Sequence, residues 1–335
     1  MNIGEIMKKG FTLIELLAII VILAVIALIV TPRVLSIIDE AKIRSFIQNN
    51  YAVTKATQNY LLESDEISSL NSGDITFTDI DYLIQNRYLS SFSNPFSSEV
   101  CSGYVLTNKL TSNFNYRTFV NCETNANNPS DDKLVARFDL QDNVLLQGLD
   151  NYNITFNSAS LSSDRFGNES SSYEFDGETQ FIRTEELSFS GFNELTISAW
   201  INPTRTSGGR EISNQRQWDM APWTGWRFRL ISGNLQLKIG DGTNNNNTCY
   251  APVNSNEWQH VVATFDSSGI RLYVNKELRN YCEMDVTLVH SSGEHTIGRY
   301  PGSAYFFEGN IDDLLIYERS LSPLEIKMKY YLSKP

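Results

Sequence analysis

Histidine, cysteine and basic residues are scarce in this 335-residue sequence. It contains three His and four Cys, and 39 Asp and Glu outnumber 27 Lys and Arg, which gives a net charge of −12. A broad basic surface for phosphate attraction is therefore not expected, and nucleic acid is excluded as a general partner. The sequence also lacks a Ser/His/Asp order, an HExxH motif and a phosphate-binding loop. These absences predict a protein that is not an enzyme.

Length and residue usage indicate the class of protein. A chain of this length exceeds the usual size of a single core, so two domains are expected, with room for a third small unit. Aromatic residues make up 12%, with 16 Tyr and 18 Phe. Together with loops rich in Asn and Ser, this composition is typical of an extracellular protein rich in β-structure.

The amino terminus contains the longest apolar run. Residues 11–31 include one charge and, as a helix, would extend about 31 Å, enough to cross a membrane. The basic pair Lys8-Lys9 and Gly10 precede this run, whereas a secretory signal has its cleavage site after it. Glu15 lies inside the apolar run, where an ionised carboxylate needs a partner. Alternatively, Glu15 lies close enough to the helix start to reach the lipid headgroups.

The run from Lys8 to Leu17, KKGFTLIELL, resembles the leader of type IV prepilins. The resemblance implies that residues 1–10 are removed by a prepilin peptidase after Gly10 and that the new Phe11 amine is methylated. It also implies that Glu15 pairs with the Phe11 amine of a neighbouring pilin subunit, and that Pro32 kinks the helix, as in related pilins. The protein would be a single-pass protein of the cytoplasmic membrane before assembly, and afterwards part of a pilus at the cell surface.

The middle of the chain continues the helix and then changes character. Apolar residues at three- and four-residue intervals predict that the helix extends over 11–63. Residues 64–122 predict a small α+β unit, with a short helix near 79–87 and strands near 104–106 and 116–120. This unit is similar to small pilin heads of Gram-positive type. Residues 123–133 are polar, contain a proline and predict a linker.

The four cysteines form two widely spaced pairs rather than a zinc knuckle. Cys101 pairs most simply with Cys122, and Cys249 with Cys282, because each pair lies within one predicted domain and needs the shortest loop closure. Two such disulfides indicate an oxidising location outside the cytoplasm. The alternative is four buried thiols that act as small apolar residues.

Residues 134–335 predict an all-β domain. Short apolar or alternating runs are separated by Gly, Asn and Ser, and only 323–332 look helical. Several runs, including TISAWINP, WQHVVATFD, LYVN and IDDLLIYERSLSP, resemble bacterial laminin-G-like domains. The resemblance implies a concanavalin A-like jelly roll, so the expected fold class is multidomain: a long helix, a small α+β head and a β-sandwich. Trp200, Trp226 and Trp258 are predicted to fill its core.

Some members of that family hold a structural calcium ion through oxygen ligands near the sandwich rim, which is the chemistry that calcium needs. The candidate ligands are Asp176, Asp312 and Asp313. The alternative is that Asp176, which precedes a glycine, is a turn residue and that the paired aspartates are solvated.

Two aromatic loops are candidate ligand-binding sites, because exposed aromatic faces stack on sugars or on partner side chains. In the first, Trp218 and Trp223 would be the flat contacts, with Arg216 and Asp219 as polar neighbours. Tyr300 and Tyr305 form the second. The alternative for all four aromatic residues is burial that anchors the loops.

These features predict a minor type IV pilin-like subunit that displays a lectin-like domain for adhesion to a glycan or a surface protein. One alternative is a pseudopilin of a secretion or DNA-uptake machine with a structural head. The other is a glycan-cleaving enzyme, because related glucanases carry a Glu-x-Asp-x-x-Glu strand. Here Asn310 and Leu315 stand at the first and last of those positions, which argues against catalysis.

Overall fold

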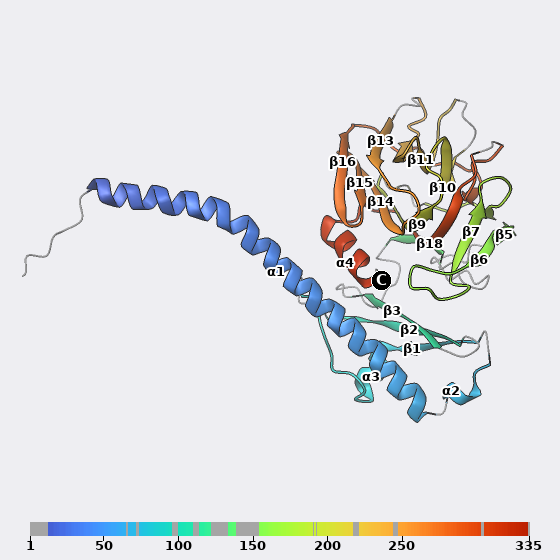
Figure 1. Ribbon diagram of the computed structural model, residues 1–335, viewed down its shortest axis with the longest axis horizontal. Coiled ribbons are helices and arrows are strands. Elements are labelled where there is room, and N and C mark those ends of the chain that lie inside the picture. The colour runs from blue at the N-terminus through green and yellow to red at the C-terminus, as the bar shows by residue number, and fades with distance from the viewer. Residues whose placement is uncertain are drawn as a thin grey trace, which may run out of the picture. The chain divides into compact units, whose positions relative to one another are not determined.

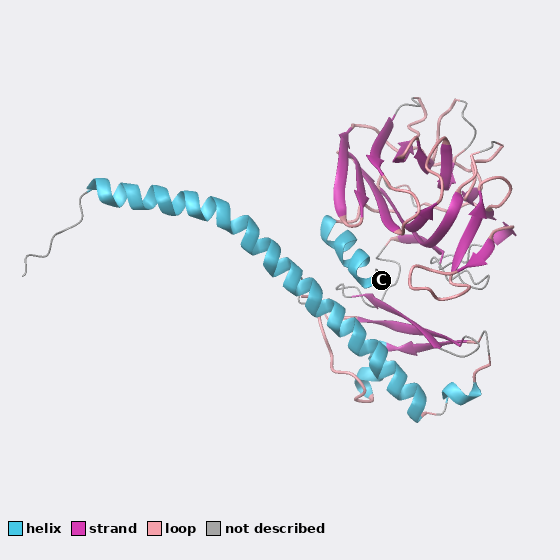
Figure 2. Cartoon of the chain, in the orientation of Figure 1, coloured by secondary structure: helices cyan, strands magenta, loops and turns pink. Residues whose placement is uncertain are grey.

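The chain folds into two compact units, Met1–Thr124 and Asn125–Pro335, and the boundary falls within the predicted linker at 123–133. They are called here the amino-terminal and the carboxy-terminal unit (Figures 1 and 2). The computed structural model describes residues 13–64, 66–71, 74–95, 100–109, 114–121, 133–138, 154–189, 191, 193–216, 221–243, 247–302 and 305–333.

A long helix opens the amino-terminal unit. Helix α1 runs over Leu13–Glu63, close to the predicted 11–63, and bends gradually along its length (Figure 1). It continues through position 32, although the side chain of Pro32 lies outside the described part. Gly10 and Phe11 also lie outside it. Glu15 and the apolar residues beside it, such as Leu13 and Ile20, are exposed.

Among the side chains that are described, no helical stretch is long and apolar enough to cross a membrane.

The head of the amino-terminal unit is a three-stranded antiparallel sheet with short helices. Its elements are α2 (Glu66–Ser69), β1 (Ile75–Asp79), α3 (Ile80–Gln85), β2 (Ser102–Lys109) and β3 (Phe114–Asn121), with strand order β1-β2-β3. The two predicted strands and the short helix are confirmed, whereas β1 was not predicted. Asp79 begins α3 by accepting a hydrogen bond from the Tyr82 amide at 3.1 Å, because a free amide in the first turn needs an acceptor. Cys101 is buried and disulfide-bonded, while Cys122 lies outside the described residues.

The carboxy-terminal unit is a sandwich of two antiparallel sheets (Figure 2). The seven-stranded sheet has the order β13 (Asn247–Pro252), β12 (Asn234–Ile239), β11 (Trp226–Ile231), β10 (Gly209–Gln215), β17 (His295–Ile297), β8 (Ile182–Thr184) and β5 (Ile154–Asn157). The eight-stranded sheet has the order β16 (Glu277–Glu283), β15 (Gly269–Val274), β14 (Gln259–Asp266), β9 (Leu195–Pro203), β18 (Glu308–Tyr317), β7 (Ser172–Asp176) and β6 (Ser160–Ser162), and β4 (Leu134–Phe138) also pairs with β18.

The main core lies between the two sheets and follows the two-residue period of the strands. In β11, Trp226, Phe228 and Leu230 all point into it and are almost completely buried. Each such side chain stabilises the fold by about 1.5–3 kcal/mol. The prediction that Trp226 fills the core is confirmed. Trp200 is also buried but does not belong to this cluster, and Trp258 is only half-buried.

Helix α4 (Pro323–Ser333) covers the outer face of the eight-stranded sheet. A capping box formed by Ser322 and Glu325 begins the helix. The Ser322 amide donates to the Glu325 carboxylate at 2.7 Å, and the Glu325 amide donates to the Ser322 hydroxyl at 3.3 Å. Ile326 packs with Val262, Tyr273 and other buried residues in a second, smaller apolar cluster. Helix α4 is therefore an integral part of the sandwich.

A disulfide between Cys249 and Cys282 joins the two sheets, as the cysteine spacing predicted. Cys249 lies on β13 and Cys282 on β16, which are the edge strands of their sheets. Closing a loop of 33 residues stabilises the folded state by about 4 kcal/mol, chiefly by restricting the unfolded chain.

Two completely buried histidines make the stability of this unit depend on pH. Burial and then the charge of Arg165 lower the pKa of His260 to about 3, and burial alone lowers that of His295 to about 3. Both imidazoles are therefore neutral when folded, whereas the unfolded chain takes up protons below its pKa of about 6.5. The contribution of the two histidines to the free energy of unfolding is fully present above pH 6.5 and is lost as the pH drops toward 3.

At pH 5 each histidine is expected to lower the free energy of unfolding by about 2 kcal/mol relative to pH 7. Urea unfolding of the His295→Gln variant from pH 7 to pH 5 should show a correspondingly smaller decrease than that of the unchanged protein. His290→Gln, which replaces the third histidine, is the control. An equal pH dependence in the protein and in the His295→Gln variant would contradict the assignment.

Candidate functional site

Asp176, a candidate calcium ligand, is a turn residue. Its carboxylate accepts hydrogen bonds from the amides of Glu178, Thr179 and Gln180 at 2.8–2.9 Å. Partial burial raises the pKa of this carboxyl, but the hydrogen bonds from Thr179 and the neighbouring amides outweigh it and hold the pKa well below its usual range. The Asp-Gly turn offered as an alternative in the sequence is what the structure contains.

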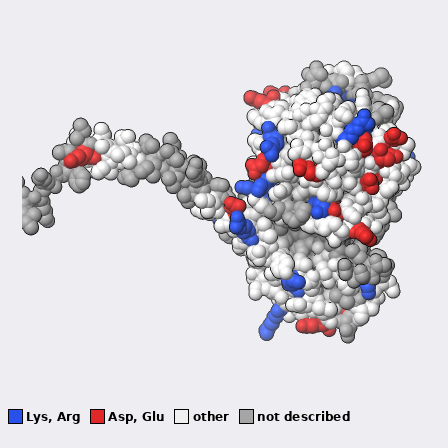
Figure 3. All heavy atoms as spheres, in the orientation of Figure 1, with Lys and Arg blue, Asp and Glu red and all other residues white. Residues whose placement is uncertain are grey.

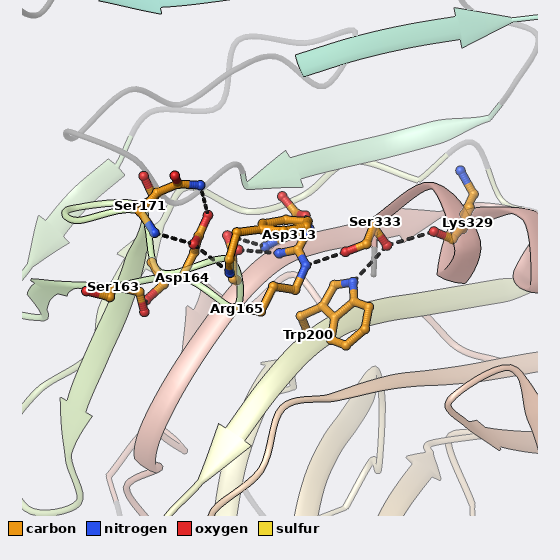
Figure 4. Close-up of polar contacts among 12 residues, drawn as sticks. Ser163, Asp164, Arg165, Ser171, Trp200, Asp313, Lys329 and Ser333 are labelled. Atoms are coloured by element: carbon orange, nitrogen blue, oxygen red, sulfur yellow. Dashed lines mark hydrogen bonds and ion pairs between the residues drawn. The ribbon is translucent and has the colours of Figure 1, made fainter. Parts of the chain in front are cut away.

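The other two candidates, Asp312 and Asp313, lie on β18 and pair with one guanidinium. Figure 4 shows Asp313 beside Arg165. Arg165 donates to Asp312 at 2.5 Å and to Asp313 at 2.6 Å. Asp176 is far from them along the strand, because it pairs with Glu308 of β18, four residues before Asp312. In the described ranges, no three His, Cys, Asp or Glu side chains are grouped to hold a metal ion. The structure thus does not bring the three carboxylates together, and calcium stays a prediction.

The Arg165 cluster also holds Ser333, the last residue of α4 (Figure 4). The Arg165 guanidinium donates to the backbone carbonyl of Ser333, and the Trp200 indole donates to the Ser333 hydroxyl at 2.8 Å. Trp200 stacks on Tyr330 of α4, with ring centroids 5.7 Å apart. These contacts therefore hold α4 against the eight-stranded sheet.

The residues of the first predicted aromatic loop differ in accessibility from the prediction. Arg216 is 2% exposed and lies inside the unit rather than beside a surface ligand. Trp223 is half-buried, and its backbone carbonyl accepts from the Gly242 amide at 2.7 Å. Trp218 and Asp219 lie outside the described residues. The structure therefore offers no exposed pair of tryptophans in the part of this loop that it describes.

The two tyrosines of the second predicted aromatic loop differ in exposure. Tyr300 is 4% exposed, so it is not a surface contact, whereas Tyr305 is 41% exposed. Both rings cover the same side chain, with the Arg227 guanidinium 3.8 Å from the ring centre of Tyr300 and 5.7 Å from that of Tyr305. Tyr300 thus anchors the loop, and Tyr305 presents its ring to solvent.

These tyrosines lie over the outer face of the seven-stranded sheet, which carries polar side chains in register. One row crosses six strands and contains Thr248, Lys238, Arg227, Asn214, Thr296 and Arg183. A second row crosses four strands and contains Tyr250, Gln236, Arg229 and Glu211. The residues of both rows are called here the polar face. Most of these side chains are buried, Thr248, Lys238 and Arg183 are half-buried, and Tyr305 and Tyr250 are 41% and 44% exposed.

A buried ionic cluster holds the middle of the polar face. Glu211 is fully buried and accepts from Arg227 at 3.1 Å, and Arg229 lies 3.7 Å from the same oxygen. Arg229 also donates to Gln236 at 2.5 Å. The second Glu211 oxygen accepts no hydrogen bond from any residue in the described ranges. A buried carboxylate so close to two guanidinium groups is held in one position by charge-assisted hydrogen bonds.

Residues 298–302 and 305–307 lie beside this face, and their hydrogen bonds position Tyr305. The Phe307 amide donates to the Gly298 carbonyl at 2.8 Å, which closes the loop at its base. The Glu211 amide donates to the Tyr305 carbonyl at 3.2 Å. A Cβ atom on Gly209 would lie 2.7 Å from the Tyr305 ring, so the ring rests directly on the glycine backbone.

Sequence reasoning missed the polar face, although a signal for it was present. In Trp226-Arg-Phe-Arg-Leu230 charged and apolar residues alternate, which places the two arginines on the outer side of the sheet. The signal for Glu211 was weaker, because a bulge between Glu211 and Ser213 shifts the register of β10. The cross-strand contacts that assemble the face join residues up to 113 positions apart, as in Arg183 and Thr296, and no local pattern contains them.

The chemistry available on the polar face is recognition by hydrogen bonds and by flat aromatic contact. On the side of the carboxy-terminal unit drawn in Figure 3, acidic and basic side chains are interspersed rather than gathered into a field of one sign. On this side, a charged ligand would therefore be bound by individual side chains rather than by a broad field of one charge.

Comparisons with known proteins agree with these observations. Residues 176–327 match the concanavalin A-like lectin/glucanases superfamily, and residues 7–31 match the prokaryotic N-terminal methylation motif. A search of curated proteins finds no match.

Three solved structures illustrate what this chain is similar to. A mutant of HCR/D has a TM-score of 0.50 at 16% identity, over 60% of this chain and 52% of that chain. The binding domain of Paraclostridial Mosquitocidal Protein 1 has a TM-score of 0.49 at 18% identity, over 60% and 52%. Domain 4 of AbnA, an extracellular GH43 arabinanase from Geobacillus stearothermophilus, in complex with arabinotriose, has a TM-score of 0.47 at 18% identity, over 60% and 98%.

This chain spans about half the length of the first two of these structures, and at such identities the similarity concerns the fold. The eight- and seven-stranded sheets and the family match together establish a concanavalin A-like jelly roll. The chain therefore combines a prokaryotic N-terminal methylation motif, the type IV prepilin signal, at residues 7–31 with a domain of the concanavalin A-like lectin and glucanase superfamily at residues 176–327.

Proposed function

We propose that the protein is a minor type IV pilin-like subunit that displays a lectin-like domain for adhesion. The observation that carries the proposal is the combination of a prepilin signal with a lectin-like sandwich in one chain. The helix and the small head suffice for polymerisation, so an added domain of some 200 residues is best explained by recognition. Its partners would be the prepilin peptidase, other pilin subunits and a ligand on a surface.

The ligand that suits the polar face is a glycan. Sugars present hydroxyl groups along their edges and apolar C–H groups on their faces, so they require hydrogen-bonding side chains beside an aromatic ring. The polar face offers the half-buried side chains of Lys238 and Thr248 on neighbouring strands, together with the exposed rings of Tyr250 and Tyr305. Glu211 and the arginines around it hold the middle of the face rigid, which lowers the entropy lost on binding.

Tyr305→Ala is expected to weaken glycan binding by about 1–3 kcal/mol while changing thermal stability little, because the ring is partly exposed and would contribute mainly to the contact. The full-length protein in detergent would be screened on a glycan array, and the affinity of each hit measured by calorimetry. Gly209→Ala should act similarly without removing the ring, since its Cβ would displace Tyr305.

The matched control is Tyr281→Ala, which removes a tyrosine of 42% exposure from β16 of the other sheet. Equal losses for Tyr305 and Tyr281 would contradict a site on the polar face. If no glycan binds, the sandwich is better explained as the structural head of a pseudopilin. Repeating the screen with a chelator tests the calcium prediction separately, because a structural calcium ion would make binding sensitive to its removal.

A further inference from the structure

Two arginines and three phenylalanines meet at the β5–β8 edge of the seven-stranded sheet. Phe156 on β5 pairs with Arg183 on β8, and the rings of Phe156 and Phe181 are stacked with centroids 4.6 Å apart. Phe306 follows Tyr305 in the loop over the polar face, and its ring centre is 6.5 Å from that of Phe181. Arg299 belongs to the same loop. These five residues are called here the arginine–phenylalanine cluster.

The two guanidinium groups lie on aromatic rings rather than in strong ion pairs. The Arg299 guanidinium is 4.0 Å from the ring centre of Phe181, and that of Arg183 is 5.9 Å from the ring centre of Phe156. Arg299 forms no ion pair with any described carboxylate. Arg183 has a loose pair with Glu294 at 3.5 Å, whose side chain is 58% exposed. Such an exposed pair contributes little, so it leaves Arg183 available to another anion.

Both arginines also bury a donor without an acceptor. The Nε atoms of Arg183 and Arg299 are inaccessible to solvent and donate to no described residue. Burial lowers the pKa of Arg299, and the nearby positive charge of Arg183 lowers it further. Two like charges held near each other are costly for a folded protein, and an anion beside both guanidinium groups would offset that repulsion.

The cluster is rigid enough to be a site. The Arg299 carbonyl accepts hydrogen bonds from Asn214 and from Thr296, each at 2.7 Å, and both of these residues belong to the polar face. The Arg183 carbonyl accepts from Thr155 at 3.2 Å. Phe156, at 40% exposure, presents part of its ring to solvent beside the guanidinium groups. An anion and a flat apolar surface can therefore be bound together here.

We propose that the arginine–phenylalanine cluster binds the acidic group of a charged sugar, so that the glycan recognised by the polar face carries an anionic residue. This inference rests on the proposed function. The anionic group would lie between Arg183 and Arg299, and the sugar ring would stack on Phe156. The net charge of −12 does not prevent this binding, because at physiological salt charges more than about 8 Å away are largely screened.

The test compares an oligogalacturonate with its methyl ester, which has the same rings without the charge. The full-length protein in detergent should bind the acid, and its affinity for the acid should fall as the salt concentration is raised. Its affinity for the ester should be at least tenfold lower than its affinity for the acid. Arg299→Gln and Arg183→Gln should each weaken binding of the acid by about tenfold to a hundredfold, as expected for a lost hydrogen bond to a charged group. Arg299→Lys should lose less, because it keeps the charge.

Phe156→Ala should weaken binding of the acid but leave the salt dependence unchanged. Arg279→Gln, in an exposed position on the β16 edge of the other sheet, is the matched control and should bind normally. Tryptophan fluorescence during urea unfolding verifies that each variant is folded. A sulfated oligosaccharide of similar length distinguishes a sulfate-bearing sugar from a uronate, and tight binding of either, lost in Arg299→Gln, supports the proposal.

Three results would overturn this inference. The first is equal binding of acid and ester, with loss only in Tyr305→Ala; this would leave the proposed lectin function intact but place the site elsewhere on the polar face. The second is unchanged binding of the acid by folded Arg299→Gln and Arg183→Gln. The third is tighter binding of single-stranded DNA than of any acidic glycan, which would favour a DNA-uptake subunit instead. Absence of binding to any glycan, charged or neutral, would reject the proposed function itself.

Discussion

Arg165→Ala is expected to lower the free energy of unfolding of the carboxy-terminal unit by about 3–5 kcal/mol. The Arg165 side chain is 4% exposed, and its partner Asp312 is fully buried. Removing the guanidinium would leave the Asp312 charge in the interior without its cation, and such a charge is costly. The same change removes the hydrogen bond to Ser333 and the contact with Trp200, so α4 should also become more accessible to proteases.

Urea unfolding followed by tryptophan fluorescence measures this effect in the full-length protein. All five Trp residues lie after residue 125, so their fluorescence reports on the carboxy-terminal unit alone. Asp313→Asn is the control and should lower the free energy of unfolding by less than Arg165→Ala does, because the Asp313 side chain is 20% exposed. The Arg165→Ala/Asp312→Ala double variant should lose less stability than the sum of its single variants. A loss below about 1 kcal/mol for Arg165→Ala would contradict a buried pair.

The sequence was sufficient to predict most of the elements that position this cluster. The runs TISAWINP, WQHVVATFD, LYVN and IDDLLIY of the predicted all-β domain lie largely within β9, β14, β15 and β18. Their alternating or continuous apolar runs depend only on local sequence, and so did the helix at 323–332. The family resemblance supplied the jelly-roll arrangement, which periodicity alone does not specify.

The partners of individual side chains could not be predicted in the same way. Asp312 and Asp313 have the composition of a calcium site, but their actual partner, Arg165, is almost 150 residues away in the sequence. Trp200 was assigned to the core because it lies in a strand, yet it is buried on the other face of the sheet by α4. Which face of a strand is covered depends on elements that fold over it later, and the period of the strand does not contain that information.

The candidate site shows the same division. Tyr305 was identified from an aromatic loop and is exposed, whereas Tyr300 in the same loop is buried over Arg227. The Arg227 guanidinium, which pairs with the buried Glu211, lies 3.8 Å from the ring centre of Tyr300 but 5.7 Å from that of Tyr305. Aromatic content singled out the loop, but the packing of each ring determines which one remains exposed.

Replacement of Gly10 by Val is expected to abolish maturation of the protein. The methylation motif at residues 7–31 includes Gly10, and the position after it becomes the new amino terminus in prepilins. A peptidase that cuts after glycine must bring the backbone of that residue close to its catalytic groups, and a β-branched side chain would obstruct this approach. The Gly10→Val protein should therefore accumulate in the membrane with residues 1–10 still attached.

Intact-mass analysis of surface and membrane fractions distinguishes the two forms. The unchanged protein should begin at Phe11 and carry one added methyl group, whereas the variant should retain the mass of the leader and be missing from the surface. Gly4→Val, which lies in the same leader but away from the cleavage position, should be processed normally and controls for effects on synthesis or insertion. A mature protein that begins at Met1, or a Gly10→Val protein that is still cleaved and displayed, would contradict the assignment. In either case the apolar run would have to be explained as a permanent membrane anchor, because only removal of the leader frees the Phe11 amine that could neutralise Glu15 in a neighbouring subunit.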